Sequence, residues 1–107
     1  MTKHFKEVFQ RDHYRCVYCG RDLMVDFETF MIIQEDHLVP LSKGGEDVPN
    51  NVVIACAICN SLKHDYVPSK KLTANNRSQY IGEIRGHVMN RRASKMEEFV
   101  EWTHSSE

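Results

Sequence analysis

Two C-x-x-C pairs constrain the fold of this chain more than any other feature of its sequence. Cys16-Val-Tyr-Cys19 and Cys56-Ala-Ile-Cys59 contain all the cysteines among its 107 residues. A C-x-x-C turn points two sulfurs to one side, and two such turns can complete a tetrahedral four-cysteine zinc site. Such a site would join two segments far apart in the chain and would leave no cysteine free to act as a nucleophile.

A disulfide framework and a redox-active pair are the alternatives for the same cysteines. The N-terminal segment MTKHFKEVFQRD lacks the apolar stretch of an export signal. The sequence also contains no apolar run long enough to predict a membrane helix. We therefore expect a cytoplasmic protein with reduced thiols and no membrane partner, which disfavours disulfides. Neither pair lies in the βαβ pattern of a thioredoxin-like motif, so the sequence predicts structural Zn²⁺.

The length of the chain predicts a single domain, residues 1–107, and a core of this size gains from a structural metal. Hydrophobic residues make up 41% of the chain and charged residues 27%, which is ordinary for a globular protein. We expect residues 1–66 to form a zinc-bound core and residues 67–77 to form a connector. Residues 78–104 are predicted to form a C-terminal helix with Ser78 as its N-cap.

The hydrophobic pattern predicts an α+β fold. Residues 3–13 have the spacing of a short amphipathic helix. Residues 27–39 are rich in aromatic and β-branched side chains and predict a strand, as do residues 51–55. Residues 41–50 have the composition of a loop, and residues 59–65 are expected to be helical.

The predicted C-terminal helix has apolar residues at three- and four-residue spacing along its whole length. These residues are Ile81, Ile84, Val88, Met89, Ala93, Met96 and Val100. The aromatic residues Phe27, Phe30, Phe99 and Trp102 are expected in the core rather than as stacking platforms for bases. The sequence leaves open whether this helix covers the core or pairs two copies into a homodimer.

The formal net charge of -1 hides two oppositely charged segments. Residues 22–47 contain seven acidic residues and one basic residue, whereas residues 60–95 contain eight basic residues and two acidic residues. A basic segment can bind the phosphates of DNA. Runs of exposed charge are also typical of a solvated helix face.

The segment from residue 35 to residue 63 contains the side chains that phosphodiester hydrolysis requires. Water must be deprotonated, and the charge growing on the phosphate and the leaving oxygen must be stabilised. His37 can deprotonate water, because imidazole titrates near neutral pH. Asp36 and Asn60 offer oxygen ligands to a hard divalent ion. Because neighbours on a regular strand point to opposite faces, a bulge or twist near Pro40 would be needed to aim Asp36 and His37 at one phosphate.

Lys63 and His64 lie three and four residues after Asn60, so they share a helix face with it. Lys63 could contact the phosphate of the substrate or be a solvated lysine. His64 could be a third metal ligand or a further phosphate contact. Asn60 itself could be only a helix N-cap after the second cysteine turn.

The whole segment resembles the HNH endonuclease family. The signature of that family is roughly D-H-x-x-P, a glycine-rich loop, an asparagine, and C-x-x-C-[HN]-x-x-K. The matching residues, in order, are Asp36-His37-Leu-Val-Pro40, Gly44-Gly45, Asn51, and Cys56-Ala-Ile-Cys59-Asn60-Ser-Leu-Lys63. The combination is specific, because it fixes several residue types at once.

The resemblance implies a ββα-metal fold, with His37 as general base and with Asp36 and Asn60 as ligands of one divalent ion. It implies that Asn51 ties the loop and orients the base, and that the products carry a 5′-phosphate and a 3′-hydroxyl. Asn60 stands where other members have histidine, and an all-oxygen site favours Mg²⁺ or Mn²⁺. His64 corresponds to a histidine ligand of some nuclease toxins in the same superfamily.

The sequence therefore predicts a metal-dependent endonuclease that acts on DNA, with structural Zn²⁺ and catalytic Mg²⁺ or Mn²⁺. One alternative is a zinc-stabilised DNA-binding module without catalysis, although a binder needs none of Asp36, His37 and Asn60. Another alternative is a subunit of a larger restriction or phage-packaging complex, in which a partner supplies specificity.

Overall fold

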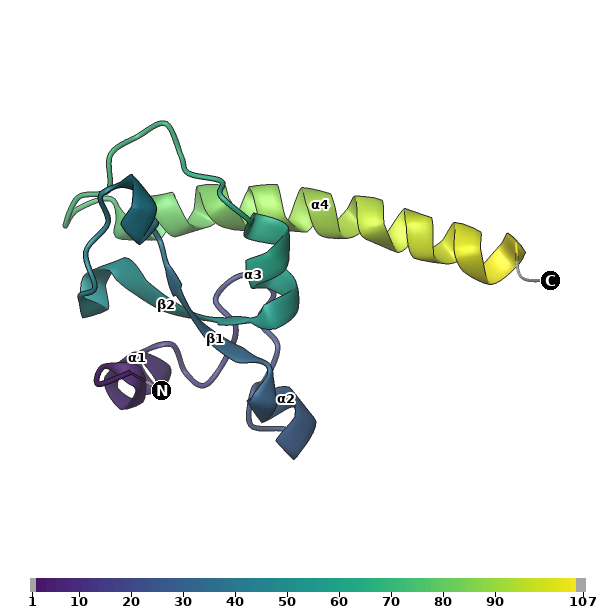
Figure 1. Ribbon diagram of the computed structural model, residues 1–107, viewed down its shortest axis with the longest axis horizontal. Coiled ribbons are helices and arrows are strands. Elements are labelled where there is room, and N and C mark those ends of the chain that lie inside the picture. Colours follow the sequence, from purple (N-terminus) through teal and green to yellow (C-terminus); the bar gives the residue numbers. More distant parts are fainter. Residues whose placement is uncertain (1, 106–107) are drawn as a thin grey trace.

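A two-stranded antiparallel sheet lies at the centre of the fold. In the computed structural model, which describes residues 2–105, β1 (Ile33–His37) pairs with β2 (Val52–Cys56) in a regular register that ends at His37 and Val52. Helix α1 (Phe5–Arg11) lies on one side of the sheet, and α3 (Ala57–Lys63) and the start of α4 (Arg77–Ser105) lie on the other (Figure 1). This sandwich buries all five residues of β2. The predicted α+β fold is confirmed.

The second cysteine turn joins β2 directly to α3. Cys56 is the N-cap of α3, and its sulfur accepts a hydrogen bond from the N–H of Cys59 at 3.4 Å. This bond supplies a partner for one of the free N–H groups at the helix start. The helix therefore begins at Ala57, two residues before the predicted start at Cys59.

The predicted strand over residues 27–39 is wrong in its first half. Residues Phe27–Met31 form a short helix, α2, and β1 begins only at Ile33. The carboxylate of Asp26 accepts a hydrogen bond from the N–H of Thr29 at 2.8 Å, and this N-cap outweighs the β-propensity of the residues that follow. Phe27 is 68% exposed rather than in the core.

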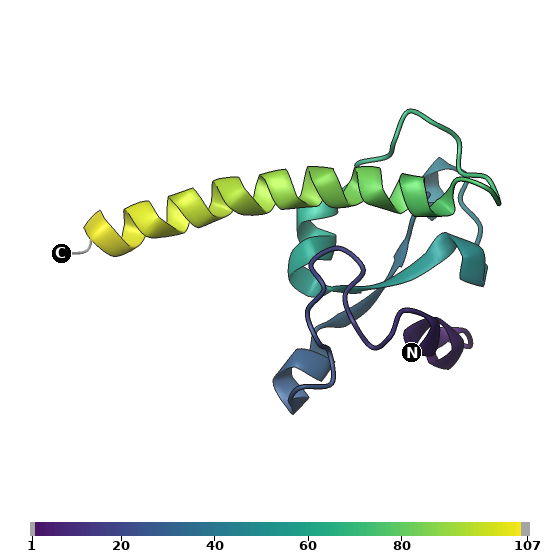
Figure 2. The same ribbon diagram turned by 180° about the vertical axis from the view of Figure 1, so that it is seen from behind.

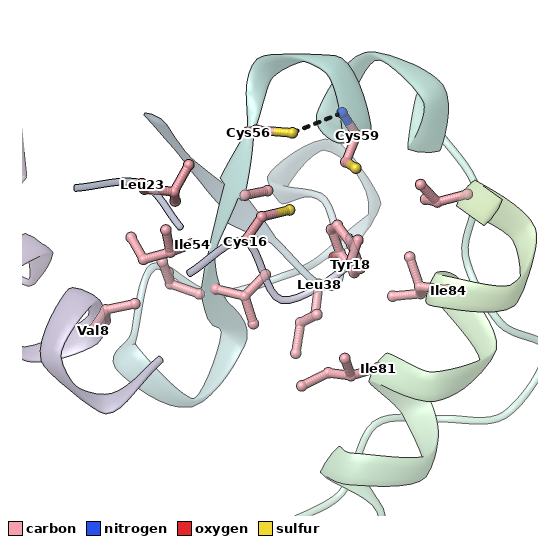
Figure 3. Close-up of a cluster of buried hydrophobic side chains, with 14 of the residues drawn as sticks. Val8, Cys16, Tyr18, Leu23, Leu38, Ile54, Cys56, Cys59, Ile81 and Ile84 are labelled. Atoms are coloured by element: carbon pink, nitrogen blue, oxygen red, sulfur yellow. Dashed lines mark hydrogen bonds between the residues drawn. The ribbon is translucent and has the colours of Figure 1, made fainter. Parts of the chain in front are cut away.

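Helix α4 is 29 residues long, which corresponds to about 43 Å. It begins at Arg77, so Ser78 lies inside the helix and is not its N-cap. Its first three turns pack on the core through a set of buried residues (Figure 3). These residues are Tyr80, Ile81, Ile84 and Val88. The first part of α4 is therefore an integral part of the core.

The second part of α4 extends beyond the rest of the protein (Figure 2). None of residues 89–104 is buried, and Phe99 and Trp102 are 60% and 71% exposed. The prediction that these two aromatic residues lie in the core is therefore wrong. Between residues 2 and 105, no helix is both long enough and apolar enough to cross a membrane.

Candidate functional site

The four cysteines converge into one cluster, as the sequence predicts. Their sulfur atoms all lie within 4.8 Å of one another, and those of Cys19 and Cys56 are 3.9 Å apart. Four Zn–S bonds of about 2.3 Å in tetrahedral geometry place the sulfurs about 3.8 Å apart. The cluster thus fits Zn²⁺, with three of the four cysteines buried.

The first cysteine turn is shaped by backbone hydrogen bonds. The N–H of Cys16 donates to the carbonyl of Arg21 at 3.0 Å, and the N–H of Gly20 donates to the carbonyl of Cys16 at 2.9 Å. Gly20 has a φ of +77°, in the region that favours glycine. Cys19 donates its N–H to the sulfur of Cys16 at 3.5 Å, so both sulfurs point to the same side.

The crowded sulfurs strongly perturb one another. Hydrogen bonds from Cys56 and Cys59 lower the pKa of the Cys16 thiol. The neighbouring Cys16 in turn raises the pKa of Cys59. Four thiolates this close repel one another unless a cation neutralises them, which suits a divalent metal ion.

Asp36 lies in a buried network beside the cysteine cluster. The hydroxyl of Tyr18, within the first cysteine turn, donates to the Asp36 carboxylate at 2.5 Å. Burial, and next the charge of Asp36, raise the pKa of Tyr18, so the phenol keeps its proton and remains a donor. The ammonium of Lys63 lies 3.0 Å from each carboxylate oxygen of Asp36.

Lys63 is buried, with 1% of its surface exposed. Its ammonium also donates to the backbone carbonyl of His37 at 2.8 Å. The side chain holds Asp36 and the end of β1, which argues against the predicted phosphate contact of Lys63. An ionised carboxylate offers about four lone-pair positions. Tyr18 donates to one carboxylate oxygen of Asp36 and Lys63 donates to the other, so both oxygens already have protein partners.

Asn60 is held by a residue that the sequence analysis did not identify. Its side-chain amide nitrogen donates to the side-chain oxygen of Gln34, on β1. The carboxamide oxygen of Asn60 is then directed away from this contact and is free for a cation. Because Cys56 caps α3, Asn60 lies inside the helix and is not its N-cap.

A hollow of about 480 Å³ lies beside Asn60, and His64 is among its lining residues. His64 ends α3 with a φ of +52°, and its Nδ1 is 3.0 Å from a carboxylate oxygen of Asp65. The hollow therefore gathers amide, imidazole and carboxylate groups on the α3 side of β1.

His37 lies on the opposite face of β1 from Asp36. Strand pairing stays regular as far as His37 and Val52, so no bulge turns the two side chains to one face. The Nε2 atom of His37 is 3.0 Å from a carboxylate oxygen of Asp47, and this hydrogen bond lowers the pKa of Asp47. The sequence analysis missed Asp47, whose only signal was a carboxylate in the loop after the strand.

Asn51 ties that loop to the end of β1. Its side chain accepts the N–H of Val39 at 2.9 Å and donates to the carbonyls of Val39 and Glu46 at 3.0 and 2.8 Å. The loop wraps so closely that a Cβ atom on Gly45 would lie 1.8 Å from the Val39 carbonyl oxygen. Glycine is therefore required at this position.

Comparison with known families gives one match. Residues 16–66 match the family model described as HNH endonuclease. The match indicates an HNH domain over these residues. The match spans both cysteine pairs, the sheet and α3. Searches of curated proteins and of solved structures found no match to this chain.

The basic segment, residues 60–95, is less available to bind phosphate than its sequence indicates. Arg77 donates to the backbone carbonyl of Asn50 at 2.8 Å, and Arg85 donates to that of Val17 at 2.7 and 3.0 Å. Lys63 also donates to a backbone carbonyl and Lys95 pairs with Glu98, so four of the eight basic residues of this segment are bound to protein oxygens.

Proposed function

We propose that this HNH domain is a metal-dependent endonuclease that hydrolyses the phosphodiester bonds of DNA. The observation that carries the proposal is the pairing of His37 with Asp47 at the end of β1, within the matched domain. The side chain of Asp36 contacts Lys63 of α3, and Asn60 is itself on α3. Both therefore lie on the opposite face of β1 from the His37–Asp47 pair. In-line hydrolysis places the attacking water and the leaving oxygen on opposite sides of phosphorus. Because β1 has no bulge, the phosphate would have to lie across the end of this strand to meet both the base and the ion.

His37 is the proposed general base. With Nε2–H donating to Asp47, the lone pair of Nδ1 can accept a proton from water. Asp47 would hold the ring in this tautomer and stabilise the imidazolium that forms. The water oxygen would then bond to phosphorus as the bond to the 3′-oxygen breaks. The 3′-oxygen would leave with the bonding electron pair and take a proton from solvent, so the products would carry a 5′-phosphate and a 3′-hydroxyl.

Asp36 and Asn60 are the proposed ligands of a divalent ion, with His64 as a further candidate. The ion would stabilise the charge on the phosphate and on the leaving oxygen. Oxygen donors favour Mg²⁺ or Mn²⁺. Gln34 supports this role, because it engages the nitrogen of the Asn60 carboxamide rather than its oxygen.

A plasmid assay tests the proposal. Wild-type protein with Mg²⁺ or Mn²⁺ should nick or cleave supercoiled DNA, and His37→Ala should slow the reaction about 10²- to 10⁴-fold. The zinc content and circular dichroism spectrum should not change. His104→Ala, which alters an exposed histidine on the second part of α4, is the matched control and should retain activity. A fully active His37→Ala variant would exclude His37 as the base.

The burial of the Asp36–Lys63 pair favours a second candidate function, a DNA-binding module without catalysis. If Asp36 serves only the fold, the domain lacks one of its two proposed ion ligands. This candidate predicts salt-sensitive DNA binding that is independent of divalent ions, with no cleavage in a panel of metals. Cleavage that depends on Mg²⁺ or Mn²⁺ would exclude it.

A further inference from the structure

A groove of about 560 Å³ separates the glycine-rich loop from the connector before α4. Its walls come from residues 43–51 on one side and residues 67–74 on the other. Figures 1 and 2 show the connector passing beside the short 3₁₀ helix Leu41–Lys43, near the point where β1 ends. Two segments far apart in the sequence thus form a single channel on the surface.

The lining of the groove is positively charged. Lys43, Lys70 and Lys71 line it, and Glu46 is the only acidic residue among the lining residues that the structure describes. All three lysines are exposed. The ammonium of Lys43 donates to the backbone carbonyl of Asp65 at 2.9 Å, which positions the side chain without neutralising its charge. Ser69 and Thr73 add hydroxyl donors to the connector wall.

The groove differs from most of the rest of the basic segment, with Arg91 and Arg92 on the extended part of α4 as the exceptions. Lys63, Arg77 and Arg85 donate to protein oxygens, and Lys95 is 3.2 Å from a carboxylate oxygen of Glu98. Lys70 and Lys71 instead stand side by side on the connector and are exposed. Their charge is therefore available to an anionic partner.

The groove and the candidate base share the loop that contains Glu46 and Asp47. Asn51 lines the groove and binds the backbone of Glu46, and the next residue, Asp47, contacts His37. A polyanion in the groove would therefore run along the loop that positions His37. This shared loop favours the strand being cut over an unrelated acidic protein.

We propose that the groove binds the sugar–phosphate backbone of the DNA substrate next to the bond that is hydrolysed. The proposal rests on the proposed nuclease function and extends it to a phosphate-binding subsite. Lys70 and Lys71 would each neutralise a phosphate, with Lys43 facing them across the channel. Each phosphate contact adds about 0.9 to the slope of log Kd against log salt concentration.

Fluorescence anisotropy with a labelled DNA duplex tests the subsite separately from cleavage. The His37→Ala background in Mg²⁺ prevents cutting, and the double variant Lys70→Glu/Lys71→Glu is compared with Arg91→Glu/Arg92→Glu. The two double variants make the same change in charge, but the second lies on the extended part of α4. We expect about tenfold weaker binding for the groove variant and a salt slope lower by about two. The α4 control should lose much less affinity.

Equal losses in the two double variants would overturn the proposal, because they would indicate a general charge effect. Unchanged DNA binding of the groove variant, with weaker binding of poly-L-glutamate, would assign the groove to an acidic protein and would also overturn the proposal.

The subsite proposal and the nuclease proposal can fail separately. If the protein binds duplex DNA through the groove but cuts no plasmid, the subsite proposal stands and the nuclease proposal fails. If the wild-type protein cuts DNA and the Lys70→Glu/Lys71→Glu variant, with His37 intact, binds and cuts equally well, only the subsite proposal fails.

Discussion

The cysteine cluster and the candidate catalytic residues come from neighbouring positions in the chain, but they are organised in different ways. The four sulfurs already converge within 4.8 Å. Asp36, His37 and Asn60 instead face three different protein partners, Lys63, Asp47 and Gln34. Backbone turns place the four sulfurs of the first site at the spacing of a zinc site. In the second site, a substrate and an ion would have to form contacts that side chains now make with one another.

The largest effect should come from breaking the cysteine cluster. Structural zinc contributes about 10–16 kcal/mol of binding free energy, comparable with the whole stability of a small domain. Cys59→Ser should therefore lose zinc, unfold and show no nicking, even with excess Mg²⁺, because Cys59 and Asn60 are adjacent on α3. Zinc analysis, circular dichroism and the plasmid assay measure these losses.

Ser61→Ala is the control for this prediction, because it changes an exposed residue on the same helix. It should keep its zinc, its fold and its activity. We expect the cysteine cluster to position Asn60, because Cys59 and Asn60 are neighbours on α3. An active protein without zinc would contradict this expectation.

A smaller effect should come from the buried pair that lies between the two sites. Removal of one partner of a buried ion pair costs about 3–5 kcal/mol, so Lys63→Met should lower the free energy of unfolding by that amount in urea denaturation. The double variant Asp36→Asn/Lys63→Met should be more stable than Lys63→Met, because no unpaired carboxylate remains buried.

Lys70→Met is the matched control for Lys63→Met and should change stability by about 0.5 kcal/mol or less, as expected for an exposed site. If Lys63→Met kept full stability and instead weakened DNA binding, the phosphate contact predicted from the sequence would be correct after all.

The smallest effect should come from Asp47, whose contact with His37 is exposed to solvent. Asp47→Asn should lower kcat about tenfold, the low end of what the loss of an orienting partner costs, with no change in the thermal midpoint. Because the pKa of Asp47 is lowered, its contact is fully present above the ordinary pKa of aspartate and is lost as pH falls through the lowered value.

The pH–rate profile therefore sharpens this prediction. Because the pKa of Asp47 is lowered, this carboxylate stays ionised near neutral pH, and its own titration should not appear in the profile there. Glu46→Gln removes the neighbouring charge and should leave kcat unchanged. Equal losses in the two variants would show that loop charge, rather than the contact with His37, determines the rate.

The sequence predicted the features that depend on local backbone geometry. Two C-x-x-C turns predicted the cluster, and alternation along β1 placed Asp36 and His37 on opposite faces. The contacts of single side chains were not predictable in the same way. The partner of Lys63 lies 27 residues earlier in the chain, so no local pattern distinguishes this buried lysine from a solvated one.

Two further differences have similar causes. In the segment that begins at Phe27, aromatic and β-branched residues indicated a strand, but one capping side chain, Asp26, makes it a helix. In α4, apolar spacing predicted a helix correctly but could not show where its packing partner ends. That point, after Val88, depends on the size of the rest of the domain.

The extension of α4 beyond Val88 has a consequence for how the molecule unfolds locally. A helical segment as short as residues 89–105 is marginally stable in water by itself, because most helix stability in proteins comes from packing. Amide hydrogens on the first three turns of α4 should exchange with solvent only when the whole domain opens, and those of residues 92–104 should exchange by local fraying. A single continuous helix should thus behave as two cooperative units. The radius of gyration, 15.0 Å against about 13 Å for a compact chain of this length, already reflects the exposed unit.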